Sequence, residues 1–264
     1  MLSRAPLGAE FGSERGRFVR AAIVKHAVPC GVAQRSSVAV AVREALHADP
    51  VSAYGGIVAT DAPLDGAAAN ELRDFFLEIV AAPGFDAEAL AILRAKKQLR
   101  LMQFGRMLPD ELAHELRLRS ALGGVLAEDD DPDAPPEKWR VVSSRKPNAQ
   151  EWHDLAFAWD VVHHVKSNGI VIVKGGTTRG ICAGQTNRVS AVQIAAQRAG
   201  KNAAGAACAS DGFFPFADGL EAAVASGCTA IIAPGGSIRD EEVVAAADRH
   251  GAALVFSSYR YFAH

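Results

Sequence analysis

Two adjacent side chains near the start of the chain, Lys25 and His26, have the types that proton transfer requires. They follow a short apolar run that predicts a buried strand, and they precede a turn set by Pro29 and Gly31. Lysine supplies a positive charge with three donors, and histidine exchanges a proton near neutral pH. The pair suits attack of an amine on a carbonyl, with one group removing the proton and the other stabilising the oxyanion. A solvated lysine beside a structural histidine is the alternative interpretation.

Several turns in the second half carry residues that a scaffold alone does not require. Asn168 stands where a strand begins, and Arg188 precedes a helix, a place that suits a phosphate. The stretch 210–218 sets phenylalanines and a proline between two aspartates, which fits either a slot for a flat heterocycle or a buried plug. The loop 234–237 either cradles an anion or simply turns, and Arg260 suits a phosphate.

Composition excludes several classes of protein. The chain has 264 residues, 49% of them hydrophobic, and a net charge of −2, so no global basic field exists for nucleic acid. Its four cysteines form no C-x-x-C pair, which argues against a zinc knuckle and for a reducing compartment. The sequence shows neither a signal-peptide core nor an apolar run of membrane-spanning length. We therefore expect a cytoplasmic protein that binds neither nucleic acid nor membrane.

Alternating periodicities predict an α/β fold with mixed sheets covered by helices. The expected organisation is a lead-in at 1–20, a first subdomain at 21–127, an acidic and proline-rich link at 128–142 and a second subdomain at 143–264. The two halves share a loose plan that hints at a duplicated unit. The predicted helices lie at 36–48, 70–80, 86–95, 111–122, 149–165, 190–198, 219–226 and 240–250. The predicted strands lie at 23–24, 98–103, 170–173, 177–182, near 208, at 229–233 and at 253–257, and 51–59 is a glycine-kinked segment that enters a strand.

A set of ordered motifs runs along residues 21–264. They are Lys25-His26-Ala27-x-Pro29-Cys30-Gly31, Asp49-Pro50-x-Ser52-Ala53-Tyr54-Gly55-Gly56, Lys166-Ser167-Asn168, Ala183-Gly184-Gln185-x-x-Arg188, Ser210-Asp211-x-Phe213-Phe214-Pro215-Phe216-x-Asp218-Gly219, Pro234-Gly235-Gly236-Ser237-x-Arg239-Asp240-Glu241 and Arg260-x-Phe262-x-His264. In this order they resemble the AICAR transformylase domain of the PurH family of bifunctional purine enzymes. The resemblance implies two cytidine-deaminase-like subdomains and a homodimer with active sites across its interface. It also implies formyl transfer from 10-formyltetrahydrofolate to the amino group of AICAR or a close amino-carboxamide ribonucleotide.

The resemblance further implies roles for individual residues. His26 is similar to the family's proton acceptor, Lys25 to its transition-state stabiliser and Asn168 to the asparagine that faces the carboxamide. The implied nucleotide-binding residues are Gly55, Arg188, Phe213, Arg260 and Phe262, and the implied folate-binding residues are Phe214, Pro215, Asp218, Ser237 and Ile238. No zinc is implied, because the H-x-E and P-C-x-x-C signature of zinc deaminases is missing. The family's potassium ion is the metal that the resemblance leaves open.

Departures from the family pattern keep alternatives open. Val28, Arg179, Cys182 and Gly212 replace residues that are usual in the family, and its Arg-Tyr-Gly-x-Asn-Pro-His-Gln segment is missing before Lys25. No cyclohydrolase segment is recognised, so we expect no ring closure. The alternatives are a pathway-specific paralogue in C-nucleoside antibiotic biosynthesis, and a non-catalytic nucleotide- or folate-binding subunit that completes a partner's site. In the latter case a second polypeptide supplies the missing segment. A zinc deaminase is the weakest of the competing interpretations.

Overall fold

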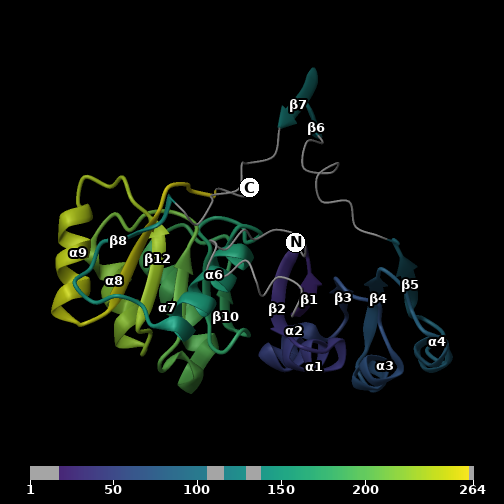
Figure 1. Ribbon diagram of the computed structural model, residues 1–264. Helices are drawn as coiled ribbons and strands as arrows, with labels where there is room; N and C mark the ends of the chain where they lie inside the picture. The colour runs from purple at the N-terminus through teal and green to yellow at the C-terminus, as the bar shows by residue number, and fades with distance from the viewer. Residues whose placement is uncertain (1–17, 106–115, 129–137, 262–264) are drawn as a thin grey trace.

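The computed structural model describes residues 18–105, 116–128 and 138–261. These residues form two mixed sheets with helices packed against them and a separate two-stranded hairpin (Figure 1). The predicted α/β class, with mixed sheets covered by helices, is confirmed. The cytidine-deaminase-like kinship and the limits of the two subdomains stay predictions. Along the described parts of the chain, no helix is both long enough and apolar enough to cross a membrane.

The first sheet has five strands in the order β2-β1-β3-β4-β5. Its strands and helices are β1 (Val19–Lys25), β2 (Val28–Arg35), α1 (Val38–Ala48), α2 (Pro50–Ala53), β3 (Gly56–Thr60), α3 (Gly66–Leu72), β4 (Leu77–Ala82), α4 (Ala87–Arg94) and β5 (Arg100–Gln103). β1 is antiparallel to β2 and β3, whereas β3, β4 and β5 run parallel. The core of this half lies between the sheet and its helices, where Ile23, Leu46 and Leu72 are buried.

The second sheet has six strands in the order β10-β9-β11-β12-β13-β8. Its elements are β8 (Arg140–Val141), α6 (Ala149–Val162), β9 (Ile170–Val173), β10 (Thr178–Cys182), α7 (Arg188–Ala199), the 3₁₀ helix η3 (Gly200–Ala203), β11 (Ala207–Ser210), α8 (Ala217–Ala225), β12 (Ala230–Pro234), α9 (Asp240–Arg249) and β13 (Ala253–Ser257). On β9, Ile170 and Ile172 face the cluster of α7, α8 and α9, and Val171 and Val173 face α6. Burial on both faces explains why this strand is apolar throughout.

The two sheets repeat one connectivity. In each, a hairpin is followed by a helix, by a strand antiparallel to the first strand of the hairpin, and by two further parallel strands. Gly31 on β2 and Gly180 on β10 repeat the same contact, since an added Cβ would overlap the carbonyl oxygen of Ala45 on α1 or Ala195 on α7. The repetition hinted at by the sequence is therefore present in the strand order.

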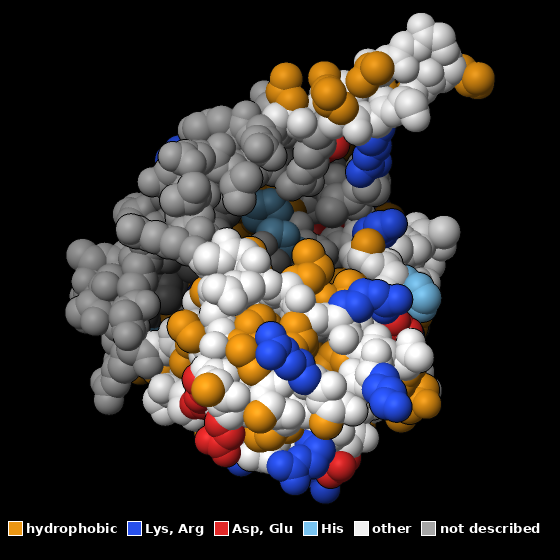
Figure 2. All heavy atoms as spheres, turned by 90° about the vertical axis from the view of Figure 1, so that its right-hand side faces the viewer, with side chains coloured by type: hydrophobic (Ala, Val, Ile, Leu, Met, Phe, Trp, Pro, Cys, Tyr) orange, Lys and Arg blue, Asp and Glu red, His pale blue; other side chains and the backbone are white. Residues whose placement is uncertain are grey.

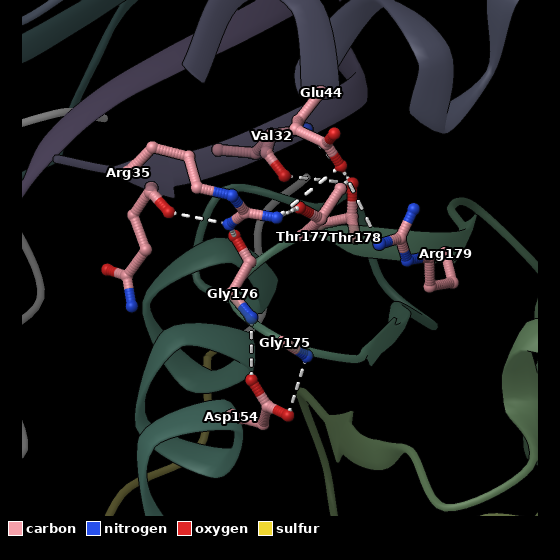
Figure 3. Close-up of polar contacts among 10 residues, drawn as sticks. Val32, Arg35, Glu44, Asp154, Gly175, Gly176, Thr177, Thr178 and Arg179 are labelled. Atoms are coloured by element: carbon pink, nitrogen blue, oxygen red, sulfur yellow. Dashed lines mark hydrogen bonds and ion pairs between the residues drawn. The ribbon is translucent and has the colours of Figure 1, made fainter. Parts of the chain in front are cut away.

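The two halves meet along their edge strands β2 and β10 (Figure 3). The N–H of Gln34 donates to the carbonyl oxygen of Gly176 at 2.9 Å, and the N–H of Val32 donates to Thr178 Oγ1 at 2.9 Å. Asp154 of α6 in turn accepts from the N–H of Gly176 at 2.7 Å. Hydrogen bonds therefore hold the two sheets edge to edge.

Polar side chains fix where most helices begin. The capping residues are Ser37, Asp49, Asp65, Asp86, Asn148 and Asn187. At α6 the cap is reciprocal, because Asn148 accepts from the N–H of Glu151 at 2.9 Å and Glu151 accepts from the N–H of Asn148 at 2.9 Å.

Two predicted helices are wrong. In place of a helix at 70–80, α3 ends at Leu72 and β4 begins at Leu77. The pattern was ambiguous there, and pairing of β4 between β3 and β5 decides for a strand. The predicted helix 111–122 is wrong over 117–121, which forms β6 (Arg117–Ala121) and pairs with β7 (Gly124–Glu128). Gly123, with φ of 81°, allows the tight turn between them.

Parts of some predictions fall outside the described residues. They are the lead-in up to residue 17, positions 111–115 of the predicted helix and positions 129–137 of the acidic link. Of the described end of that link, Arg140–Val141 is strand β8 and pairs with β13 at the edge of the second sheet.

Candidate functional site

The first group of candidate residues lies at the β1-β2 turn. Lys25 ends β1, and its Nζ donates to the carbonyl oxygen of Tyr54 at 2.6 Å. His26 and Ala27 form the turn, with left-handed φ angles of 54° and 60°, and both are exposed. The predicted turn at Pro29 and Gly31 is wrong, because both residues lie in strand β2, which pairs with β1. Two left-handed central residues are typical of type I′ hairpin turns, which normally use glycine or asparagine. A histidine and an alanine there carry conformational strain of about 1 kcal/mol or more each.

The backbone and rings around Tyr54 complete this first group. Gly55, with φ of 74°, donates its N–H to the carbonyl oxygen of Phe76 at 2.8 Å. A methyl group built on Gly55 would lie 4.0 Å from Lys25 Nζ, so these two predicted site residues are neighbours. The ring centroids of Tyr54 and Phe76 are 5.1 Å apart. Residue Tyr54 is 62% exposed and residue Phe76 is 42% exposed. Phe76 was missed by sequence reasoning, because it belongs to no motif.

The second group lies where β9 begins and β11 ends. Asn168 donates from Nδ2 to the carbonyl oxygen of Gln185 at 2.7 Å, and its N–H donates to the same oxygen at 3.1 Å. Arg188 Nη1 reaches the carbonyl oxygen of Gly169 at 3.3 Å and forms an ion pair with Asp211. The loops that follow β10 and β11 are thereby tied to the segment that carries Asn168.

The ion pair of Arg188 with Asp211 is buried. Arg188 is 7% exposed and Asp211 is completely buried. Within the described part of the chain, Arg188 Nε and Asp211 Oδ2 have no hydrogen-bond partner. The N–H of Tyr261 donates to the carbonyl oxygen of Asp211 at 2.9 Å, which places the segment of Arg260 beside this loop. Arg188 was predicted to contact a phosphate, and in this structure its charge is already balanced by Asp211, one of the two aspartates of the 210–218 stretch.

The predicted nucleotide- and folate-binding residues of the loop after β11 differ in exposure. Phe214 is buried and packs against Gly219, where an added Cβ would lie 2.6 Å from its ring. Phe216, which lies between Phe214 and Gly219 in the sequence, is 50% exposed. The carboxylate of Asp218 accepts a hydrogen bond from the N–H of Gly219 at 2.7 Å. Phe213 and Pro215 are half-buried. The loop is therefore part plug, at Phe214, and part exposed surface, at Phe216, and its role as a slot for a heterocycle stays a prediction.

The loop after β12 closes on its own helix. The N–H groups of Gly236 and Ser237 donate to the Asp240 carboxylate at 2.7 and 3.1 Å. These donors are thus occupied, which favours the simple turn over an anion cradle for this loop. Its neighbour Arg239 lies over the ring of Phe216, with Cζ 4.8 Å from the centroid. This contact joins the two loops that carry the predicted folate-binding residues.

The remaining predicted residues lie at the surface or beyond the described chain. Ile238 is completely exposed, and Arg260 is exposed. Phe262 lies outside the described residues.

Residues contact one another within each group, and none of the contacts given above joins the two groups. Among the described residues, no hydrogen bond, ion pair or ring contact joins Lys25 or His26 to Asn168. The first group belongs to β1 and the loop before β3, and the second to the ends of β9, β10, β11 and β12.

A cavity of about 250 Å³ lies between the two halves, and none of its lining residues belongs to the two groups of candidate residues described above. It is lined by Cys30, Ala48, Asp49, Pro50, Arg179, Gly180, Ile181 and Arg198. Burial, and then the nearby Asp49 carboxylate, raise the pKa of the Cys30 thiol. A thiol with a raised pKa is a poor nucleophile. Over the residues that the structure describes, no cluster of three or more His, Cys, Asp or Glu side chains suits a metal ion.

Fold and site together define an α/β protein of two repeated mixed sheets whose connecting loops carry polar and aromatic residues in two groups. A family model matches residues 7–198, and the chain belongs to that family, the AICARFT/IMPCHase bienzymes. It is 48% identical to the bifunctional purine biosynthesis protein PurH of Synechococcus sp. (strain CC9311) over 92% of this chain and 46% of that protein. It is 49% identical to the protein of the same name from Cereibacter sphaeroides (strain ATCC 17029 / ATH 2.4.9) over 98% of this chain and 50% of that protein. The chain spans about half the length of these curated relatives.

Proposed function

We propose that this chain transfers a formyl group from 10-formyltetrahydrofolate to the amino group of AICAR or a close amino-carboxamide ribonucleotide. Membership of the family supports one-carbon transfer, and the name of the relatives supports a purine-like acceptor. The structural observation that carries the proposal is the left-handed backbone of His26. A strained, exposed histidine beside a lysine is costly to keep in a turn that would fold better with glycine, so a role in chemistry explains its presence.

The proposed chemistry uses His26 and Lys25 in different roles. The acceptor amine is a weak nucleophile, because its lone pair is delocalised into the imidazole ring. It attacks the formyl carbon, His26 takes the proton, and the N–C bond forms. The ammonium of Lys25 stabilises the oxyanion; of its three N–H donors, one is bound by Tyr54 and two remain for the substrate. Collapse of the intermediate breaks the bond to the folate nitrogen, which takes up a proton.

The second group of residues, together with Gly55 of the first group, supplies the proposed binding contacts. Asn168 contacts the carboxamide, and Gly55, Phe213, Arg260 and Phe262 bind the nucleotide. Phe214, Pro215, Asp218, Ser237 and Ile238 lie on the folate side. Because Arg188 is buried and paired with Asp211, we assign it to holding these loops, and Arg260 to the phosphate.

We further propose that the active unit is a homodimer. Lys25 and His26 have no contact to Asn168 within the described residues, although the reaction requires all three at one substrate. A second copy that places its own Asn168 group beside the first group of this chain satisfies this requirement. Potassium stays a candidate ligand, and no step of the proposed reaction depends on it.

The test is a formyl-transfer assay with the purified chain, 10-formyltetrahydrofolate and AICAR. Its two readouts are the release of tetrahydrofolate and the mass of the product. His26→Ala should lower the rate by about 10²-fold or more. His47→Ala, which removes an exposed histidine from α1, should leave it unchanged. Equal rates for the wild type and His26→Ala would reject the catalytic role. Binding of both substrates without any transfer would instead support the binding-subunit alternative.

The departures at Val28 and Arg179 motivate a comparison of acceptors. In the same assay, an analogue with a pyrazole or C-linked base should be formylated more slowly than AICAR. Faster turnover of the analogue would replace the proposed acceptor by a pathway-specific one.

A further inference from the structure

The ring of Tyr261 lies in a stack of flat rings at the end of α6. Its centroid is 3.9 Å from that of His163, and the two ring planes are only 6° apart. His163 stacks in turn on His164, with centroids 4.9 Å apart, and Trp159 packs on Tyr261 at 5.1 Å. Tyr261 is only 3% exposed. The stack therefore holds this ring in the interior of the protein.

The backbone on both sides of Arg260 is anchored by its neighbours. Beyond β13 the chain forms no helix or strand as far as its last described residue, so no ladder of hydrogen bonds holds it. Before Arg260, Ser257 Oγ donates to the carbonyl oxygen of Tyr259 at 2.8 Å. After it, the N–H of Tyr261 donates to the carbonyl oxygen of Asp211 at 2.9 Å. The position of Arg260 thus depends on where the ring and the N–H of Tyr261 are held.

Other basic groups of the described chain are engaged within the fold. Arg188 is buried and paired with Asp211. On the face shown in Figure 2, which carries α4 and β5, Lys and Arg side chains stand singly among hydrophobic and uncharged ones. On that side, Lys96 donates to carbonyl oxygens at the end of α3, and Arg100 is paired with an acidic side chain of β4. A phosphate contact is therefore sensitive to the placement of Arg260.

We propose that His163 is a positioning residue, which stacks on Tyr261 and thereby holds Arg260 where the phosphate of the ribonucleotide binds. The inference rests on the proposed function, which assigns Arg260 to that phosphate. A guanidinium binds phosphate through paired and directed N–H donors, so its contact is lost when the backbone that carries it shifts.

The end of a helix does not by itself require this stack. His163 ends α6 with its N–H bonded to the carbonyl oxygen of Trp159, and His250 ends α9 with its N–H bonded to that of Ala246. Among the described residues, His163 has the ring contacts and His250 has none. His250 is therefore a matched control, a histidine at the same place of another helix.

The test measures binding of AICAR, and of the same nucleoside without its phosphate, to the purified full chain by isothermal titration calorimetry. His163→Leu keeps the volume but removes the flat ring, and should raise the Kd of AICAR about tenfold while leaving that of the nucleoside within twofold. His163→Phe keeps a flat ring and should stay within threefold of the wild type for both. His250→Leu should change neither. Thermal melts show whether each variant is folded.

A second variant makes the test independent of any general loss of stability. Arg260 is exposed, so Arg260→Met should fold and should weaken AICAR binding by at least as much as His163→Leu. In the Arg260→Met background, His163→Leu should have no further effect on the Kd of AICAR, because both changes act through the same guanidinium.

Three results would overturn the positioning role: a His163→Leu variant that binds AICAR within threefold of the wild type, an equal loss for AICAR and the nucleoside, and a wild type that binds both equally. Formyl transfer on the same preparations separates this role from the proposed function. A wild type that transfers formyl, with AICAR binding unchanged in His163→Leu, rejects the role and keeps the function. A wild type that transfers none, with phosphate-dependent binding lost in His163→Leu, rejects the function and keeps the role.

Discussion

Lys25 and Lys174 make the same contact in the two repeated halves. Lys25 Nζ donates to the carbonyl oxygen of Tyr54 at 2.6 Å, and Lys174 Nζ donates to that of Ala204 at 2.6 Å. Each acceptor precedes a glycine with left-handed φ, of 74° at Gly55 and 71° at Gly205. The lysine contact therefore belongs to the repeated scaffold, and the chemistry must come from what surrounds it in one half only.

This relationship predicts a selective effect of removing each ammonium group. Lys25→Met should lower kcat by about 100-fold, because the oxyanion loses its donor. Lys174→Met removes the same kind of scaffold contact and should leave kcat within about twofold. Steady-state kinetics on both variants, with thermal melts as a stability control, make the comparison. Equal losses of kcat would show that Lys25 acts only through the fold.

The turns after these lysines predict a trade-off between stability and activity. His26 and Ala27 adopt the left-handed backbone that Gly175 and Gly176 adopt in the other half. His26→Gly should therefore raise the free energy of unfolding by about 1 kcal/mol while lowering the formyl-transfer rate by about 10²-fold. Ala27→Gly should give a similar gain in stability with the rate retained. Urea unfolding measures the first quantity and the transfer assay the second. A destabilised His26→Gly would contradict the assignment of strain to this turn.

From the buried ion pair we predict that removing one partner destabilises the fold far more than replacing both partners by apolar residues. Asp211→Asn leaves the charge of Arg188 buried without a counterion and should reduce the free energy of unfolding by about 3 kcal/mol. Replacing both by apolar residues, as in Arg188→Met with Asp211→Leu, should recover much of that loss. Chemical unfolding of the single and double variants gives the coupling energy. Additive losses would show that the two charges do not interact.

The lowered pKa of Glu151 makes the stability of the fold depend on pH. Burial raises its pKa, but hydrogen bonds from Arg145, Thr229 and the N–H of Asn148 outweigh burial and lower the pKa from 4.5 to about 2. Since the folded-state pKa is depressed, the stabilisation is complete above pH 4.5 and is lost as the pH falls toward 2. Its size is about 3 kcal/mol.

The variant Glu151→Gln should therefore be less stable than the wild type by about 3 kcal/mol at pH 7, with the difference shrinking as the pH falls below 4.5. Urea unfolding across this range tests it. A difference that does not change with pH would assign the effect to packing instead of charge.

From the close contacts of β2 with α1 and of β10 with α7 we predict that the equivalent substitution lowers stability equally in both repeats. Gly31→Ala and Gly180→Ala each force a methyl group against the backbone of α1 or α7, and each should cost roughly 2 kcal/mol. Gly84→Ala is a matched control, because its Cβ would meet only Pro63, at 3.9 Å. Thermal melts of the three variants make the comparison. A neutral Gly31→Ala would mean that β2 can move away from α1.

The sequence by itself determined the α/β class, most helices and strands, and the strand start beside Asn168, but it placed the turn after Lys25 at Pro29 and Gly31, which lie in β2. These features depend on periodicity, caps and turn residues within a few positions of each other, such as the reciprocal cap of Asn148 and Glu151. Motif order along the chain also identified the family before any contact was known.

Only the tertiary structure decided which partner each side chain has. Asp211 balances Arg188 from 23 positions away, and Phe76 borders Gly55 from another loop, so neither contact follows from local pattern. The strand at 77–82 was misread as a helix for the same reason, because its neighbours β3 and β5 lie far along the chain. Long-range pairing and burial are properties of the assembled sheets, and they outweigh the weak propensities of short segments.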